Sequence, residues 1–141
     1  GRRPVVIVLD TDVLSEPLRQ DPDVRVLTWL EHAADGAAIT VVSVSELLYG
    51  AQRLPAGRRR NQLLVSIEQM LAVAGSRLLS YDESSARIHA SLRVTREAVG
   101  QPISVEDGMI AAICLGHEAR LATRNIKDFT GLGIDVVNPW A

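Results

Sequence analysis

Short apolar runs alternate with longer stretches of helical periodicity along this chain. The clearest run is Val5–Leu9, and similar runs occur at 38–42, 77–80, 121–123 and 135–137. Between them, apolar spacing and stop signals predict helices over about 21–34, 43–54, 63–74, 82–99 and 104–116. Strands that alternate with helices form a parallel sheet with helices on both faces. The sequence therefore predicts an α/β fold with a central parallel sheet.

Length and composition fit one folded domain over residues 1–141. The chain is 47% apolar and 23% charged, which is typical of folded proteins and excludes disorder as the main state. No apolar stretch approaches the ~20 residues of a membrane helix. The single cysteine, Cys114, lies in an apolar run and cannot form an internal disulfide. We therefore expect a cytoplasmic protein without a membrane segment.

The overall charge gives no indication of a nucleic-acid partner. The formal net charge is −2, whereas nucleic-acid-binding domains are usually strongly basic. Aromatic residues make up only 4% of the chain, which disfavours a module that stacks single-stranded bases.

Acidic residues recur where predicted strands end and helices begin. Asp10 and Asp12 directly follow the first strand, and Glu46, Asp107 and Asp128 lie at later junctions. Ligands bind at this edge of a parallel sheet. Taken singly, these acids are explained as helix caps, because residues 43–46 and 104–107 match the capping-box spacing and residues 125–128 resemble it.

Taken together, the acids indicate a cation site. Four like charges in one pocket raise one another's pKa unless a cation neutralises them. Oxygen ligands suit Mg²⁺ or Mn²⁺ better than Zn²⁺. The three histidines, His32, His89 and His117, show no paired zinc spacing, and no glycine-rich phosphate loop is present.

Five segments resemble motifs of the PIN-domain family. They are LDTDVLSE at 9–16, SELLYG at 45–50, DGMIAA at 107–112, TRNIKDF at 123–129 and NPW at 138–140. Each is weak alone, but together they stand in the family's order and span almost the whole chain. The NPW segment resembles the tail of the VapC/FitB-like branch.

The resemblance implies a three-layer α/β/α fold and a ribonuclease dependent on Mg²⁺ or Mn²⁺. By motif position, the catalytic, metal-binding quartet is Asp10, Glu46, Asp107 and Asp128, and the supporting residues are Thr11, Asp12, Thr123 and Asn125. Many members of this branch are the toxin of a toxin–antitoxin pair. The implied partners are an RNA substrate, a second copy of the chain and a VapB/FitA-like antitoxin that places a basic side chain in the acidic pocket. Contact with DNA would be indirect, through the antitoxin.

Two residues depart from the family motifs. Asp12 stands where Asn is usual, which adds a fifth acid near the pocket, and Gly108 stands where Ala is more usual. Arg124 and Lys127 flank the last acidic motif and are candidates to bind RNA phosphates, although both are explained as well by ordinary surface charge.

Two other functions remain open from the residues alone. The Asp10–Val13 segment also resembles the opening of haloacid-dehalogenase-type phosphatases, in which Asp10 would be the nucleophile and Asp12 a general acid. That activity needs a downstream lysine, and Lys127 is the only one in the chain. Alternatively, the fold is a catalytically silent module whose acids cap helices and receive a basic partner peptide. Binding of a divalent metal separates these alternatives from the nuclease.

Overall fold

A five-stranded parallel sheet forms the centre of the protein. The structure is a computed structural model that describes residues 6–141. The strands are β1 (Ile7–Leu9), β2 (Ala37–Thr40), β3 (Leu78–Leu79), β4 (Arg120–Ala122) and β5 (Val136–Val137). Their order is β3-β2-β1-β4-β5, and every pairing is parallel. The predicted α/β class is confirmed; Val5, the first residue of the first predicted strand, lies outside the described residues.

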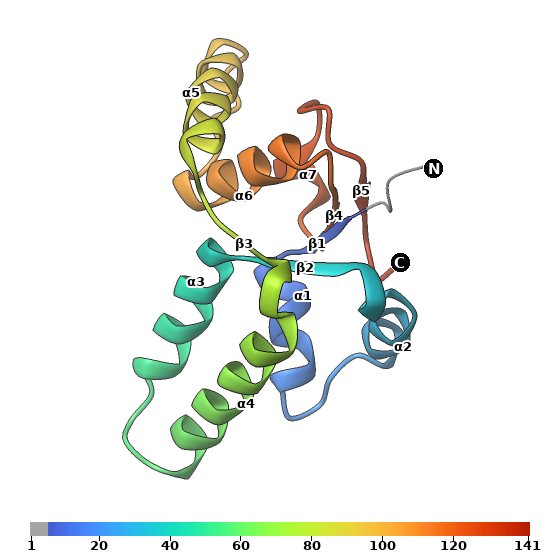
Figure 1. Cartoon of the computed structure of the whole chain (residues 1–141), viewed down its shortest axis with the longest axis vertical. Helices are drawn as coiled ribbons and strands as arrows, with labels where there is room; N and C mark the ends of the chain where they lie inside the picture. The colour runs from blue at the N-terminus through green and yellow to red at the C-terminus, as the bar shows by residue number, and fades with distance from the viewer. Residues whose placement is uncertain (1–5) are drawn as a thin grey trace.

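Helices cover both faces of this sheet, as Figure 1 shows. On one face lie α1 (Thr11–Ser15), α2 (Val24–Ala33), α3 (Val41–Gln52) and α4 (Arg58–Ala74). On the other lie α5 (Glu83–Ala98), α6 (Val105–Gly116) and α7 (Ile126–Phe129). Short 3₁₀ turns, η1 (Glu16–Leu18), η2 (Ala34–Gly36) and η3 (Gly75–Arg77), link some of these elements. The result is the three-layer α/β/α arrangement.

The central strand β1 supplies both halves of the core. Successive side chains of a strand point to opposite faces of the sheet. Ile7 and Leu9 therefore join the cluster under α1, α2 and α4, whereas Val8 joins the cluster under α5 and α6. Because both faces of β1 are buried, it is a continuous apolar run rather than an alternating one.

Two predicted helix starts are corrected by the structure. The strand expected at 38–42 ends at Thr40, whose hydroxyl accepts the backbone N–H of Ser43 at 3.2 Å, so α3 begins at Val41. Ser43 is consequently a buried residue inside the helix, and the capping box predicted there is wrong. Asn125 precedes α7, but its side chain makes no capping hydrogen bond. The cap predicted at Ser104 is confirmed, since its hydroxyl accepts the Asp107 N–H at 3.2 Å.

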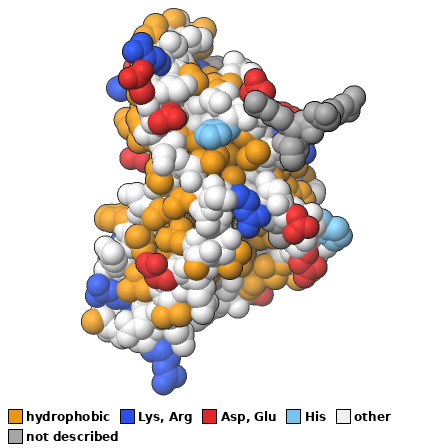
Figure 2. All heavy atoms as spheres, viewed as in Figure 1, with side chains coloured by type: hydrophobic (Ala, Val, Ile, Leu, Met, Phe, Trp, Pro, Cys, Tyr) orange, Lys and Arg blue, Asp and Glu red, His pale blue; other side chains and the backbone are white. Residues whose placement is uncertain are grey.

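The surface carries no single dominant charge on the face seen in Figure 2. Acidic and basic side chains are scattered there among hydrophobic and neutral ones.

Cys114 is buried in α6, and burial raises the pKa of its thiol to about 12, which makes the thiol unreactive. Within residues 6–141, no helix is long and apolar enough to cross a membrane.

Candidate active site

Asp10 lies at the C-terminal end of β1, in the middle of the sheet. Its backbone continues the β1–β4 pairing, with its N–H donating to the Ala122 carbonyl at 2.9 Å. The Asp10 side chain caps α1 by accepting the Thr11 N–H at 2.9 Å, and its second oxygen accepts the Thr123 hydroxyl at 2.7 Å. Only 5% of Asp10 is exposed. Two elements distant in sequence therefore hold this carboxylate in one orientation.

Glu46 is oriented by a short chain of hydroxyl groups. The Thr11 hydroxyl donates to Glu46 Oε1 at 2.8 Å, and the hydroxyls of Thr11 and Ser43 are also 2.8 Å apart. Because the Thr11 hydrogen is given to Glu46, the Ser43 hydroxyl donates to Thr11. The start of α1 is thereby joined to α3, and Glu46 is turned toward the end of β1.

Asp107 and Asp128 come from the opposite layer. Asp107 sits in the first turn of α6, fixed by the Ser104 cap, and Asp128 is an exposed residue of α7. Arg96, buried in α5, holds α7 in place: its Nη1 donates to the carbonyls of Asp128 at 3.1 Å and Thr130 at 3.3 Å.

These carboxylates repel one another across the site. Burial raises the pKa of Asp10 to about 7, and repulsion from Asp12 and Asp107 adds to the rise. Burial also raises the pKa of Asp107, with further contributions from the charges of Asp128 and Glu46. The four predicted quartet residues therefore share one electrostatic environment. Within the described residues, however, no three acidic, histidine or cysteine side chains converge closely enough to form a ready-made metal cage.

The predicted supporting residues line the end of β4. The Arg124 N–H donates to Asp12 Oδ2 at 3.0 Å, and the Asn125 N–H donates to the Thr123 hydroxyl at 3.1 Å. Burial raises the pKa of Asp12, an effect opposed by the hydrogen bond from Arg124. Asn125 thus contacts Thr123 through its backbone N–H, whereas the motif suggests a role for its side-chain amide.

The two predicted RNA-binding residues differ in how they are held. The Arg124 guanidinium lies over the Trp140 ring, 5.2 Å from its centre, so the C-terminal NPW segment supports it. Lys127 is exposed on α7 and forms no ion pair with any residue that the structure describes.

Gly108 directly follows Asp107 and lies against His89 of α5. A Cβ atom at position 108 would come within 2.5 Å of His89 Nε2 and 2.8 Å of its Cδ2. His89 is buried and held by a 3.0 Å hydrogen bond between its Nδ1 and the Tyr81 hydroxyl. The glycine at this position is thus explained by the imidazole packed against it.

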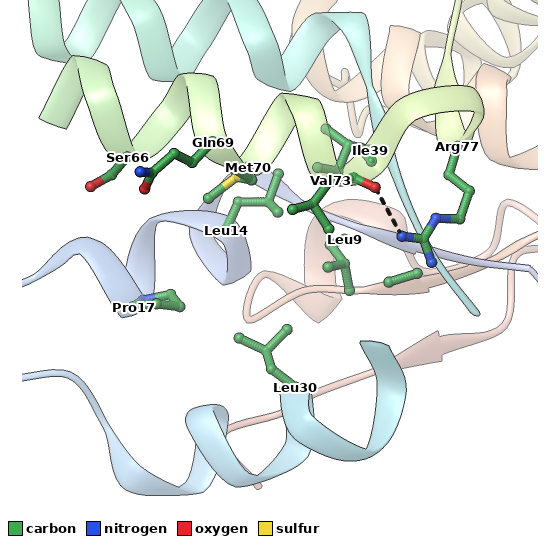
Figure 3. A pocket seen from close by; sticks show the side chains of 12 residues that line it. Leu9, Leu14, Pro17, Leu30, Ile39, Ser66, Gln69, Met70, Val73 and Arg77 are labelled. Carbon is green, nitrogen blue, oxygen red and sulfur yellow. Dashed lines mark hydrogen bonds between the residues drawn. The ribbon is translucent and has the colours of Figure 1, made fainter. Parts of the chain in front are cut away.

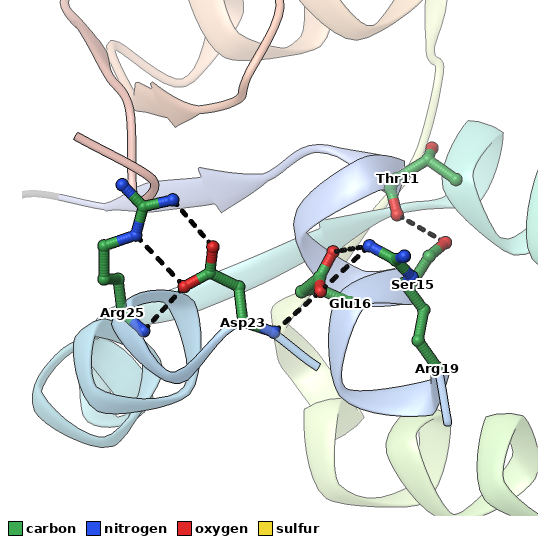
Figure 4. Close-up of polar contacts among 6 residues, drawn as sticks. All are labelled: Thr11, Ser15, Glu16, Arg19, Asp23 and Arg25. Carbon is green, nitrogen blue, oxygen red and sulfur yellow. Dashed lines mark hydrogen bonds and ion pairs between the residues drawn. The ribbon is translucent and has the colours of Figure 1, made fainter. Parts of the chain in front are cut away.

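Sequence reasoning misses two residues that support the site, Ser43 and Arg96, and a third, Glu16, that supports the connection from α1 to α2. The sequence predicts Ser43 as a helix cap, and nothing in the local sequence of Arg96 indicates its bonds to α7. Glu16 is also buried. It accepts the Asp23 N–H at 2.9 Å and pairs with Arg19 at 3.1 Å, which ties the start of η1 to the loop before α2 (Figure 4). Its place in the LDTDVLSE segment is the one signal that could have identified it.

An apolar cavity lies away from the acids, between α2 and α4. It measures about 390 Å³, and Leu14, Leu30 and Met70 are among its lining residues (Figure 3). It contains none of the quartet and offers no group for acid–base chemistry. The carboxylate cluster, not this cavity, is the candidate site of reaction.

Comparisons with known proteins agree with this arrangement. Residues 7–132 match the family model of the PIN domain. The chain is 36% identical to the toxin FitB of Neisseria gonorrhoeae, and the match covers 96% of this chain and 99% of FitB. It is 34% identical to the VapC ribonuclease Y4jK of Sinorhizobium fredii, covering 96% of this chain and 98% of that protein.

A solved structure of FitAB bound to the IR36 DNA fragment superimposes closely. The TM-score is 0.91 at 36% identity, and the match covers 96% of both chains. The family model spans most of the chain, and the relatives match it over nearly their full lengths. The chain therefore belongs to the PIN-domain family, in the branch that includes VapC ribonucleases and the FitB toxin.

Proposed function

We propose that this protein is an endoribonuclease that depends on Mg²⁺ or Mn²⁺ and acts as the toxin of a toxin–antitoxin pair. The observation that carries the proposal is the set of carboxylates at the strand ends, desolvated and mutually repelling, with the pKa of Asp10 raised to about 7. Such a site is unfavourable when empty of cations and is stabilised by a hard divalent ion. The ribonuclease activity of the VapC relative supports RNA as the substrate.

Asp10, Glu46, Asp107 and Asp128 would hold the ion. A bound divalent ion supplies charge neutralisation for the phosphodiester and for the leaving oxygen. Thr11 and Thr123 orient Glu46 and Asp10 by direct hydrogen bonds. A carboxylate of the quartet orients the attacking water and accepts its proton.

The positive side chains around the site would bind the RNA backbone. Contact with the Trp140 ring restricts the orientation of the Arg124 guanidinium. Lys127 lies on the neighbouring turn, in α7. Guanidinium and ammonium groups beside the acids would bind the phosphates that flank the scissile bond.

The structure gives no support to the phosphatase alternative. A nucleophilic Asp10 would leave Glu46 and Asp107 without a role, although Asp107 raises the pKa of Asp10 and Glu46 raises that of Asp107. The silent binding module remains the second candidate, because an acidic pocket also attracts a basic peptide.

The deciding experiment compares RNA cleavage by the wild type and an Asp107→Asn variant. Cleavage of a structured RNA should require Mg²⁺ or Mn²⁺ and stop in EDTA. Asp107→Asn should lower the rate by at least ~100-fold, because a charged group that stabilises the reacting centre is lost. Glu106→Gln is the matched control: this exposed acid, next to Asp107, should leave the rate nearly unchanged. Equal cleavage in EDTA, or by Asp107→Asn, would rule out the metal-dependent nuclease.

A toxin role predicts a second behaviour and a partner. Expression of the wild type in bacteria should arrest growth, whereas Asp107→Asn should not. We propose that the cognate partner is a VapB/FitA-like antitoxin that inserts a basic side chain among the acids and through which the pair contacts DNA. We also propose that the chain forms a homodimer, which sedimentation of the purified protein tests directly. If expression of the wild type leaves growth unaffected, the toxin role is refuted, and the cleavage assay alone decides whether the protein is a nuclease.

A further inference from the structure

The Asp12 carboxylate has one oxygen that the described part of the chain leaves without a partner. Asp12 lies in the first turn of α1, and its Oδ2 accepts the Arg124 N–H at 3.0 Å. Its Oδ1 is completely buried and has no hydrogen-bond partner among residues 6–141. A buried acceptor without a donor is rare in folded proteins and calls for an explanation, such as an ion.

The two donors beside Asp12, the Val13 N–H and the Thr123 hydroxyl, are already used by Asp10. Thr123 has a single hydroxyl hydrogen, which it donates to Asp10 Oδ2 at 2.7 Å. The Thr123 oxygen in turn accepts the Asn125 N–H at 3.1 Å. Asp10 and Asp12 both lie beside Thr123, whose single hydroxyl hydrogen serves Asp10.

Anchoring of Arg124 does not account for the charge on Asp12. A single carbonyl oxygen suffices to accept the Arg124 N–H, and the side-chain amide of an asparagine has one. What the carboxylate adds is a second anionic oxygen. Its negative charge adds to that of Asp10 at this end of the sheet.

We propose that Asp12 is a fifth carboxylate of the divalent-metal site, whose Oδ1 faces the same ion as Asp10 or a water molecule held by that ion. The inference rests on the proposed metal-dependent function and assigns to this chain a more anionic site than the quartet provides. Hard divalent ions bind more tightly as anionic oxygen ligands are added. The additional charge should therefore appear as higher metal affinity.

The test is a Mn²⁺ titration of the purified chain by calorimetry, with Asp12→Asn compared with the wild type. Asparagine has the same shape and keeps the bond from Arg124, so the fold is retained, which circular dichroism checks. We expect Asp12→Asn to weaken Mn²⁺ binding by ~10–100-fold. Asp21→Asn is the matched control, because it removes one exposed charge from a loop and should leave the affinity unchanged.

A second measurement separates metal binding from a structural role. In EDTA, Asp12→Asn should melt at a temperature equal to or higher than that of the wild type, because a repelling charge has been removed. A residue that only anchored Arg124 would show the same Mn²⁺ affinity after substitution, and that result would overturn the inference. A variant that melted lower in EDTA would also overturn it.

The two proposals fail in different ways. If the wild type cleaves RNA with Mn²⁺ and Asp12→Asn binds the ion equally well, only the role of Asp12 is refuted. If the wild type binds Mn²⁺ but cleaves no RNA, the nuclease is refuted, and the Asp12→Asn titration still decides the role of Asp12. If the wild type binds no Mn²⁺, both are refuted.

Discussion

Replacing Asp10 by Asn should stabilise the metal-free protein while abolishing its activity. The carboxylate is buried and repelled by Asp12 and Asp107, so its ionised form is costly in the absence of a cation. An asparagine at this position keeps an oxygen for the Thr11 N–H. Its amide can donate to the Thr123 oxygen, which frees the threonine hydrogen for other acceptors.

The size of the effect follows from the pKa of Asp10. A rise from 3.8 to about 7 corresponds to roughly 4 kcal/mol of lost stability when Asp10 is ionised, at about 1.4 kcal/mol per unit. Because the folded state holds this proton more tightly than the unfolded state, stability falls as pH rises from about 4 through about 7 and is lowest above that range. Allowing for relaxation of the site, we expect Asp10→Asn to gain roughly 2–4 kcal/mol at pH 8.5.

Thermal unfolding in EDTA at several pH values measures this gain. A stabilisation of that size should raise the melting temperature of Asp10→Asn by roughly 5–15 °C at pH 8.5, and the difference should shrink as pH falls toward 4. Asp21→Asn, which loses an exposed charge, should show no such pH-dependent difference. Added Mn²⁺ should stabilise the wild type much more than Asp10→Asn. A variant less stable than the wild type at pH 8.5 would refute the reasoning.

Three further substitutions test the support of the site. Gly108→Ala should destabilise the fold by ~1–3 kcal/mol in chemical denaturation, because the new Cβ would collide with His89 at 2.5 Å. Adding His89→Ala should recover most of that loss, whereas a stabilised single variant would contradict the packing of His89 against Gly108. Arg96→Met should lower the melting temperature and increase hydrogen exchange in α7, because the hydrogen bonds of Arg96 to the carbonyls of Asp128 and Thr130 are lost. Unchanged exchange would show that α7 needs no anchor. Thr11→Val should lower kcat at least several-fold, because Glu46 loses the hydroxyl that orients it, and Thr11→Ser should restore the rate; equal rates for the Val and Ser variants would exclude that role.

The layers of the fold could be predicted from sequence because each is a local pattern. The run at 5–9 is apolar throughout, since a central parallel strand is buried on both faces, and the helices between strands show their own periodicity. The boundary at the start of α3 could not be predicted. Thr40 and Ser43 are both good capping residues, and only the length of the β2 pairing decides that Thr40 is the cap.

The site could be predicted as a set of acids but not as a geometry. Asp10 and Glu46 stand at recognisable junctions, yet the hydroxyl of Thr11 that links them depends on how α1 packs against α3. Arg96 illustrates the limit most clearly. Its contact with Asp128 joins residues 32 positions apart, and no local pattern distinguishes it from a solvent-exposed arginine on the same helix.

The hydrogen bond between Thr123 and Asp10 joins residues 113 positions apart. During synthesis, β1 therefore leaves the ribosome more than a hundred residues ahead of the β4 end that completes its surroundings. Asp10 lacks the hydroxyl that fixes it while the intervening chain is being made. For a protein proposed to cut RNA, this order of assembly keeps the site incomplete until β4 has been synthesised.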